Sequence, residues 1–396
     1  MIVGLLLACG APAPVEVVAH DGWNDSEVAS MRSMRLVPTY APDPSNRWAD
    51  DPGAAALGES LFYDGGLSPA GIACSNCHDP TRGYADSRPL GKGIGTPARH
   101  TPSLVGSLNG PWFYWDGRAD SAWAQAVGPI ENPVEMGSDR VTVLLRVTDR
   151  HREAYEALFG ALPEVVDLPA ARPGPGPLGE AWAKIPADRQ MAVDDAFVNV
   201  VKAIAAFERT IVPAPSNFDR YVDAVVQGDP RGGGHLSPEA ERGLALFIGP
   251  ARCSACHRGP WLTDRSFHNL GLPGAFDPGR AAGATEVLAS PLNCRGRFSD
   301  TTECPELEFL NPTFQDFQAA FKTPSLRNVA ATAPYMHDGS LADLPSVLAF
   351  YNELPGDAAS NHRELTLAPL QLPAGDQAAL VAFLASLSSD LPIREE

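Results

Sequence analysis

Two short stretches decide the fold: Cys-Ser-Asn-Cys-His at residues 74–78 and Cys-Ser-Ala-Cys-His at residues 253–257. Both follow the pattern Cys-x-x-Cys-His, the signature of covalent haem attachment. The spacing has a physical reason, because two thiols three positions apart on a helical turn reach both vinyl groups of one haem while the adjacent imidazole reaches the iron. A single Cys-x-x-Cys also suits a redox dithiol or half of a zinc site, but two copies followed by His favour haem.

The sequence around the two motifs is also repeated. Gly-Glu-Ser-Leu-Phe at residues 58–62 precedes the first motif, and Gly-Leu-Ala-Leu-Phe at residues 243–247 precedes the second. Asp86 and Asp264 follow the motifs at nearly equal distances. This pattern indicates a duplication in which each half is a cytochrome-like helical unit. The residues expected to hold the two haem c groups are Cys74, Cys77, His78, Cys253, Cys256 and His257.

Length and composition predict a mainly α protein with two cytochrome c-like haem domains and long Pro/Gly-rich loops. The 396 residues exceed the size of a single core, and the 38 prolines and 36 glycines predict helices separated by loops. We expect a signal or lipoprotein segment and tether at 1–42, an N-terminal haem domain at 43–215 and a second haem domain at 216–391. A surface excursion is expected at 161–186 and a connection between the domains at 211–236.

Helical spacing of apolar residues predicts the helices that close each half. The expected core positions are Val193, Phe197, Val201, Ile204 and Ala205 in the first half, and Leu380, Phe383, Leu384 and Leu387 in the second. Ser237, followed by Pro238 and Glu239, predicts the start of the helix that leads into the second motif.

The first residues and the net charge indicate where the protein works. Met1 to Cys9 resembles the end of a lipoprotein signal, which predicts an exported, periplasmic protein anchored through a lipidated Cys9. In the alternative, the segment is an ordinary signal remnant and Cys9 has no role. The net charge of −18 argues against binding nucleic acid and allows a basic redox partner. We expect no other membrane attachment.

The sixth ligand of each iron decides between electron transfer and reactivity, because an open position can bind peroxide. The residues that offer a suitable atom are Met136, Met336, Tyr351, His100, His268 and His337. Spacing alone does not choose among them.

Four further stretches carry a family resemblance over residues 43–391. Trp-Asp-Gly-Arg at 115–118 and Gly-Pro-Ile-Glu-Asn-Pro-Val-Glu-Met-Gly at 128–137 follow the first motif. Thr-Pro-Ser-Leu-Arg-Asn at 323–328 and Ala-Pro-Tyr-Met-His-Asp-Gly at 333–339 follow the second. In these stretches the chain resembles the bacterial di-haem cytochrome c peroxidases and, more closely, their MauG and MbnH relatives.

The resemblance implies a peroxide-binding pocket at the first haem. Glu135 would move the proton between the peroxide oxygens, Gln125 would order water and Pro129 would shape the pocket. Trp115 would lie between the haems as a stepping stone for an electron hole. No histidine occurs at 88–95, where the peroxidases carry a distal one, so the first haem should be five-coordinate. Without the resemblance, Glu135 would be an ordinary loop acid, Gln125 a solvated helix residue and Trp115 a core tryptophan.

The resemblance also implies a ligand for the second iron. Fourteen residues beyond His337 the peroxidases place a methionine and MauG-like proteins a tyrosine, and this chain has Tyr351. A hard phenolate oxygen stabilises oxidised iron, whereas a thioether suits a haem that stores an electron. The alternative is a tyrosine that packs in its helix behind Asp343 and Pro345.

Two more features follow from the family pattern. The family binds calcium between the haems through an Asn and two backbone carbonyls, which fall here on Thr332 and Pro334. His100 stands at the Asn position, and this departure weakens the expectation because calcium prefers oxygen ligands. Cys294 and Cys304 flank a loop that the plain peroxidases lack, and in an exported protein they would pair as a disulfide. With Phe-His-Asn-Leu-Gly at 267–271, this loop favours the MbnH-like branch.

Three functions remain open from the sequence. The first is a peroxide-dependent oxidase in which both haems become high-valent and oxidise an aromatic residue, a tryptophan by resemblance, on an exported partner protein. The second is a di-haem cytochrome c peroxidase that reduces hydrogen peroxide with electrons from a small periplasmic donor. The third is a passive electron carrier with two low-spin haems.

Overall fold

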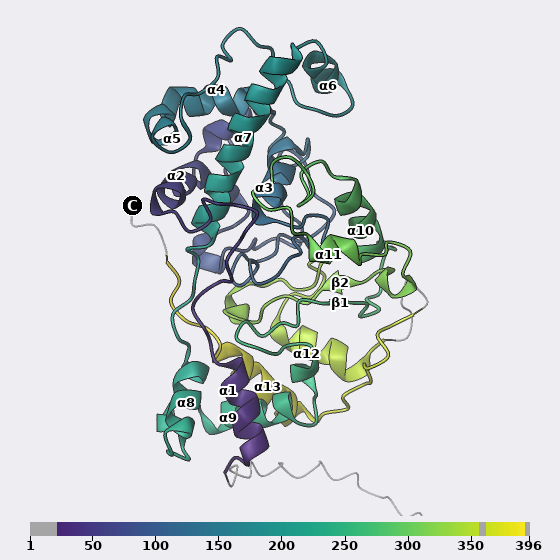
Figure 1. Ribbon diagram of the computed structural model, residues 1–396. Helices are drawn as coiled ribbons and strands as arrows, with labels where there is room; N and C mark the ends of the chain where they lie inside the picture. Colours follow the sequence, from purple (N-terminus) through teal and green to yellow (C-terminus); the bar gives the residue numbers. More distant parts are fainter. Residues whose placement is uncertain (1–21, 356–361, 393–396) are drawn as a thin grey trace, which may run out of the picture.

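The computed structural model describes residues 22–355 and 362–392, and it is mainly α, as predicted (Figure 1). Its α-helices are α1 (Asp25–Met34), α2 (Pro52–Phe62), α3 (Ala122–Glu131), α4 (Arg140–Arg150), α5 (Arg152–Phe159), α6 (Pro177–Trp182), α7 (Ala187–Glu208), α8 (Asn217–Val226), α9 (Pro238–Ile248), α10 (Arg280–Ala289), α11 (Pro305–Glu308), α12 (Leu344–Glu353) and α13 (Ala374–Ala385). Two short strands, β1 (Phe267–His268) and β2 (Phe321–Lys322), pair antiparallel.

The molecule has two helical ends with loops and short elements between them. Helices α4 to α7 lie at one end, and α1, α8, α9 and α13 lie at the other (Figure 1). Each end has its own apolar core, the first built around α7 and the second around α9 and α13. All of the core positions predicted from helical spacing are buried. The loop-rich middle is therefore where both halves meet.

The duplication inferred from the sequence is confirmed by the packing before each haem motif. Helix α2 crosses α7, and a Cβ added at Gly58 would lie 1.9 Å from the carbonyl oxygen of Ala203. Helix α9 crosses α13 in the same way, because a Cβ at Gly243 would lie 1.9 Å from the carbonyl oxygen of Ala379. Both helix pairs approach so closely that only glycine fits at the crossing.

The repeat continues beyond the motifs, where it is visible only in the structure. A backbone bridge joins Phe113 to Ala119 in the first half, and a matching bridge joins Tyr335 to Leu341 in the second. A helix begins three residues after each bridge, α3 in the first half and α12 in the second. These two helices are therefore equivalent elements of the duplicated unit.

The ends of the predicted segments differ from expectation. Residues 1–21, including Cys9, lie outside the described part of the chain. The later part of the predicted tether forms α1, whose Met31 and Met34 are buried in the core of the second half. No helix in the described part of the chain is long and apolar enough to cross a membrane.

The stretch expected to be a surface excursion and the stretch expected to connect the domains both contain packed helices. Within 161–186, helix α6 buries Trp182 against the first core. Within 211–236, helix α8 buries Phe218 and Tyr221 in the second core, so this stretch is more than a connection. High Pro and Gly content misled the prediction, because a few aromatic side chains are enough to hold a short helix on a core.

Candidate active site

A cavity of about 1120 Å³ runs through the middle of the molecule and is lined by residues of both halves. It exceeds the volume of an ordinary small-ligand pocket, roughly 300–1,000 Å³. Both Cys-x-x-Cys-His motifs face it. The cavity therefore brings the two predicted haem sites into one continuous space.

Each motif presents its histidine in the form that binds iron. Nδ1 of His78 lies 3.1 Å from the carbonyl oxygen of Tyr84, and Nδ1 of His257 lies 3.0 Å from that of Leu262. A carbonyl only accepts, so each Nδ1 carries the proton and each Nε2 is left for iron. Tyr84 and Leu262 have φ of 55° and 53°, a left-handed backbone that turns both carbonyls toward the rings.

The thiols and rings fit haem attachment. The four motif cysteines are not joined in disulfides and line the cavity: Cys74, Cys77, Cys253 and Cys256. Burial raises the pKa of the Cys74 and Cys253 thiols to about 12, which suits a neutral apolar surrounding for the porphyrin edge. Burial lowers the pKa of both motif histidines, which favours the neutral ligand form.

Tyr351 lies on α12 and lines the cavity close to the second motif. Burial, followed by the nearby Cys253 and Cys256, raises the pKa of its hydroxyl. That hydroxyl has no hydrogen-bond partner among the described residues. Since the side chain lines the cavity, its phenol oxygen is left for a group inside the cavity, and an iron ion is such a group.

Among the other residues considered as sixth ligands, His268 is excluded by its contacts. Its Nδ1 lies 2.9 Å from Glu364 Oε2, and its Nε2 lies 2.9 Å from Asp264 Oδ2. Neither ring nitrogen is free for iron. Met136 and Met336 both line the cavity, so their position alone does not separate them from Tyr351.

The first half has no side-chain ligand at the position equivalent to Tyr351. Ser121 caps α3 and Asp343 caps α12, each through a side-chain oxygen that accepts a helix N–H. Eight residues after these caps lie Pro129 and Tyr351, respectively. Pro129 also lines the cavity, and its ring has no atom that can bind iron.

Glu135 and Gln125 both line the cavity near Pro129. Oε1 of Glu135 accepts a hydrogen bond from Asn132 Nδ2 at 2.8 Å, and its backbone carbonyl accepts one from Ile94 N at 2.9 Å. Burial raises the pKa of the Glu135 carboxyl, against the lowering effect of Arg118. The carboxyl is thus held in place and exchanges its proton at a higher pH than an ordinary glutamate.

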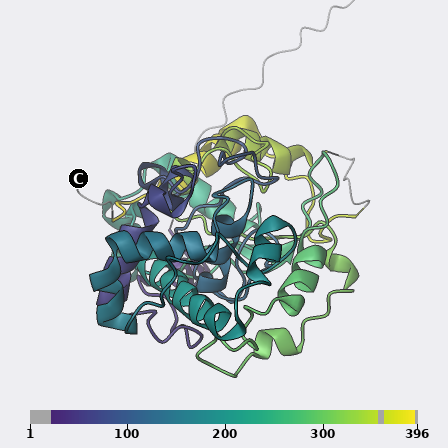
Figure 2. The same ribbon diagram turned by 90° about the horizontal axis from the view of Figure 1, so that it is seen from above.

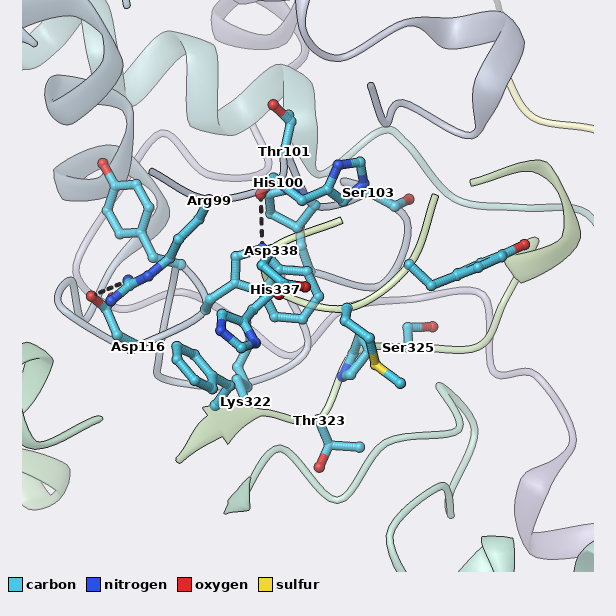
Figure 3. Close-up of a pocket in the computed structure, with 18 of the residues that line it drawn as sticks. Arg99, His100, Thr101, Ser103, Asp116, Lys322, Thr323, Ser325, His337 and Asp338 are labelled. Carbon is cyan, nitrogen blue, oxygen red and sulfur yellow. Dashed lines mark hydrogen bonds and ion pairs between the residues drawn. The ribbon is translucent and has the colours of Figure 1, made fainter. Parts of the chain in front are cut away.

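Trp115 lies on the seam between the halves. Its indole Nε1 donates to the carbonyl of His100 at 2.8 Å. The backbone N–H of His100 donates to His337 O, and that of Lys322 donates to Trp115 O, both at 2.8 Å. Each half therefore donates one backbone hydrogen bond to the other, and these bonds fix Trp115 at their junction. Figure 3 shows His100, Lys322 and His337 gathered in this region.

The residues at the expected calcium position do not fit that ion. Thr332 and Pro334 line the cavity. His100 Nδ1 lies 3.1 Å from the carbonyl oxygens of both Arg88 and Pro89, to which its N–H donates. The side chain at the Asn position is therefore a nitrogen donor already used within the protein, whereas calcium requires oxygen ligands.

Three further features lie at or near the site. Thr-Pro-Ser-Leu occurs at 101–104 as well as at 323–326, and both copies line the cavity, a repeat that the sequence already contained. Arg99 binds Asp116 at 2.5 Å (Figure 3). It also binds Asp277 at 2.8 Å, which ties the two halves together beside the cavity. The expected disulfide between Cys294 and Cys304 is formed.

Known proteins are similar to this chain in sequence and architecture. A family model described as di-haem cytochrome c peroxidase matches residues 52–227. The methylamine utilization protein MauG of Methylorubrum extorquens is 31% identical, over 98% of this chain and 95% of that protein. The chain belongs to the di-haem cytochrome c peroxidase and MauG family. Cytochrome-c peroxidase IdrP1 of Denitromonas iodatirespirans is 35% identical, over 97% of this chain and 93% of that protein.

Solved structures agree with this membership. A MauG-like protein associated with microbial copper homeostasis superposes with a TM-score of 0.63 and 26% identity, covering 89% of this chain and 95% of that one. The di-haem peroxidase BthA of Burkholderia thailandensis has the same fold, with a TM-score of 0.63 and 23% identity over 89% of this chain and 90% of that one. This di-haem family member is therefore an oxidoreductase that acts with hydrogen peroxide and carries two haem c groups.

Proposed function

We propose that this family member is a peroxide-dependent oxidase of the MauG and MbnH type that oxidises an aromatic residue, a tryptophan, of an exported partner protein. The observation that carries the proposal is the pair of equivalent positions on α3 and α12. Both residues line the cavity, so Pro129 would leave one iron open to peroxide and Tyr351 would offer the other a phenol oxygen. The similarity to a MauG-like protein of copper homeostasis supports the MbnH-like branch.

The protein contributes proton transfer at the first site. The haems, when bound, supply the iron that reacts with peroxide and hold the oxidising equivalents. Glu135, fixed by Asn132, would take a proton from one oxygen of a bound peroxide and deliver it to the other oxygen, which would leave as water. Gln125 would order water and Pro129 would shape the pocket of the first haem, since both line the cavity.

Trp115 would couple the two sites. Its indole is held by the hydrogen bond to His100 O and lies where the backbones of both halves exchange hydrogen bonds. An aromatic ring fixed between two redox centres can carry an electron hole in two short steps instead of one long one. Both irons would then share the oxidising equivalents generated at one of them.

The site also favours work outside the cytoplasm. Covalent haem attachment and the disulfide between Cys294 and Cys304 are both typical of oxidising compartments. Export, with attachment through a lipidated Cys9, stays part of the proposal. The partner is then an exported protein that meets this enzyme in the periplasm.

Paramagnetic resonance and visible spectra of the oxidised holoprotein, before and after one equivalent of peroxide, test the proposal. In the wild type we expect one high-spin and one low-spin haem whose ferric signals disappear together. In Tyr351→Phe only the first signal should respond. Mass spectrometry of co-expressed neighbour proteins should show oxidation of a tryptophan. Two low-spin haems that ignore peroxide would overturn the proposal.

A di-haem cytochrome c peroxidase is the second candidate. It is favoured by the similarity to IdrP1 and by the two methionines that line the cavity, Met136 and Met336. This function predicts methionine at the second iron, with its characteristic charge-transfer band in the oxidised state, and rapid peroxide reduction with a small cytochrome donor. If every neighbour protein stayed chemically unchanged under those conditions, this candidate would replace the first.

A further inference from the structure

A second cavity of about 290 Å³ adjoins the main one beside α3 and α10. Five residues line both cavities and so form the partition between them: Tyr114, Arg118, Asn132, Glu135 and Glu286. Glu135 is the proposed proton-transfer residue of the first haem pocket. A small polar molecule in the second cavity would thus be separated from that pocket only by the side chains of the partition.

We propose that the second cavity is the entrance by which hydrogen peroxide and protons reach the first haem pocket, with Glu286 and Asp120 as positioning residues that pass protons toward Glu135. The inference rests on the proposed role of Glu135. It does not depend on Tyr351 or on the identity of the partner.

The polar groups form a graded path. Glu286 on α10 is an exposed residue whose carboxyl group is partly enclosed, whereas Glu135 is half-buried. Between them the Arg118 guanidinium lies 3.5 Å above the Tyr114 ring and 3.0 Å from Asp116 Oδ1. A fixed cation on the partition attracts a carboxylate from either side and orients the water or peroxide that passes between.

The carboxyls along this path are tuned to exchange protons. Burial raises the pKa of Glu135, Glu286 and Asp120. Charges that act on Glu286 are those of Arg118, Asp116 and Arg99, and Arg118 also acts on Glu135. Glu306 and Asp43 act on Asp120. Groups with raised pKa hold and release protons closer to neutral pH than ordinary carboxyls.

Asp120 lines the second cavity. Its Oδ2 accepts the backbone N–H of Cys294 at 2.7 Å. Its Oδ1 is enclosed and has no hydrogen-bond partner among the described residues.

The second half of the chain builds the outer wall of this entrance. Residues after α10 line the cavity, and Asn293 is fixed there by its Nδ2, which donates to Val287 O at 2.9 Å. The next residue, Cys294, forms the disulfide and binds Asp120. Figure 2 shows α10 and the following loop, in green, against the blue and teal elements of the first half. The disulfide loop thus has a function at the first haem.

The reaction requires such a path. Reduction of one hydrogen peroxide to two waters consumes two protons and two electrons, and the electrons come from the oxidised partner or donor protein. Protons released by that protein appear at its own surface, far from the buried oxygen that becomes the second water. Protons must therefore enter the first pocket through the chain's own polar groups.

Two variants of the holoprotein test the entrance by stopped-flow with hydrogen peroxide and with bulkier tert-butyl hydroperoxide. Ala124→Phe narrows the second cavity, which Ala124 lines. We expect a roughly tenfold lower second-order rate constant, with a larger loss for the bulky peroxide and unchanged resting spectra. Glu286→Gln should slow turnover about tenfold and raise its solvent isotope effect, since general acid–base groups contribute at least that much.

Glu180→Gln, at an exposed position of α6, is the matched control and should leave every rate unchanged. Thermal unfolding of each variant separates a slow entrance from a damaged fold. Wild-type rates with both peroxides in Ala124→Phe and Glu286→Gln would overturn the entrance, whatever Tyr351→Phe does to the shared ferric signals. Conversely, slow peroxide reaction in these variants with no partner oxidation in the wild type would keep the entrance and remove only the proposed function.

Discussion

The two halves of this molecule use one scaffold and differ at one equivalent helix position that lines the cavity. In both, a glycine crossing, a Cys-x-x-Cys-His turn, a carbonyl that fixes the histidine and a capped helix follow in the same order. On that capped helix the first half has Pro129 and the second has Tyr351. Under the proposed function, a duplicated electron-transfer unit would gain a reactive site where a ligand is replaced by a ring that cannot bind metal.

Removing this difference should have the largest effect. In Pro129→Tyr the first iron gains a phenol in the position that Tyr351 has in the second half. We expect both haems to be low-spin and the second-order rate constant with peroxide to fall by about a thousandfold or more, because the open position is filled. Paramagnetic resonance and stopped-flow measure both changes. Tyr351→Met is the control: it keeps the second iron occupied and should retain the reaction of peroxide at the first iron. A Pro129→Tyr variant that reacted with peroxide as fast as the wild type would contradict the proposed difference between the halves.

The proton-transfer group of the open site gives the next effect. In Glu135→Gln we expect the rate constant with peroxide to fall by about a hundredfold, since positioned acid–base groups contribute roughly 10²–10⁴. The deprotonated carboxylate accepts the first proton, so the wild-type rate should fall as pH drops through the pKa of Glu135. Burial raises that pKa, which places the fall above the usual value of about 4.3. If the rate constant of Glu135→Gln fell over the same pH range, the titrating group would be a residue other than Glu135.

Chemistry with fixed spacing explains which parts of this comparison were predictable. Two thiols and an imidazole must meet one haem, so the residues from Cys74 to His78 and from Cys253 to His257 showed their role directly. The equivalence of Pro129 and Tyr351 was not apparent, because only a shared Asp-Gly precedes their helices and the matching bridges are backbone contacts.

Features that arise only from tertiary packing were not predictable either. The second cavity exists because α10 of the second half lies against the first half, where Arg280 donates to Gly117 O at 2.6 Å. No local pattern indicates that contact. Likewise, α8 lies in a Gly- and Pro-containing stretch, and only the second core shows why Phe218 and Tyr221 are buried there.

Substitutions at the two glycine crossings should have the smallest effect, a loss of stability that is similar in both halves. By helix propensity alone, Gly58→Ala and Gly243→Ala should stabilise the protein by up to about 1 kcal/mol. The structure predicts the opposite sign in both halves, because the added methyl would lie 1.9 Å from the carbonyl oxygen of Ala203 or Ala379. We expect each variant to lose about 1–3 kcal/mol of stability, as overpacked contacts do.

Thermal unfolding of the holoproteins, followed by circular dichroism, measures these losses as a Tm lower by roughly 2–4 °C per kcal/mol. Gly375→Ala is the control, since it lies in α13 with nothing within 4 Å of an added Cβ, and its Tm should stay level or rise. Equal losses at Gly58 and Gly243 would mean that the two helix crossings still contribute equally to stability after the haem sites diverged. A loss at only one of them would show that divergence of function has also relaxed the packing of one half.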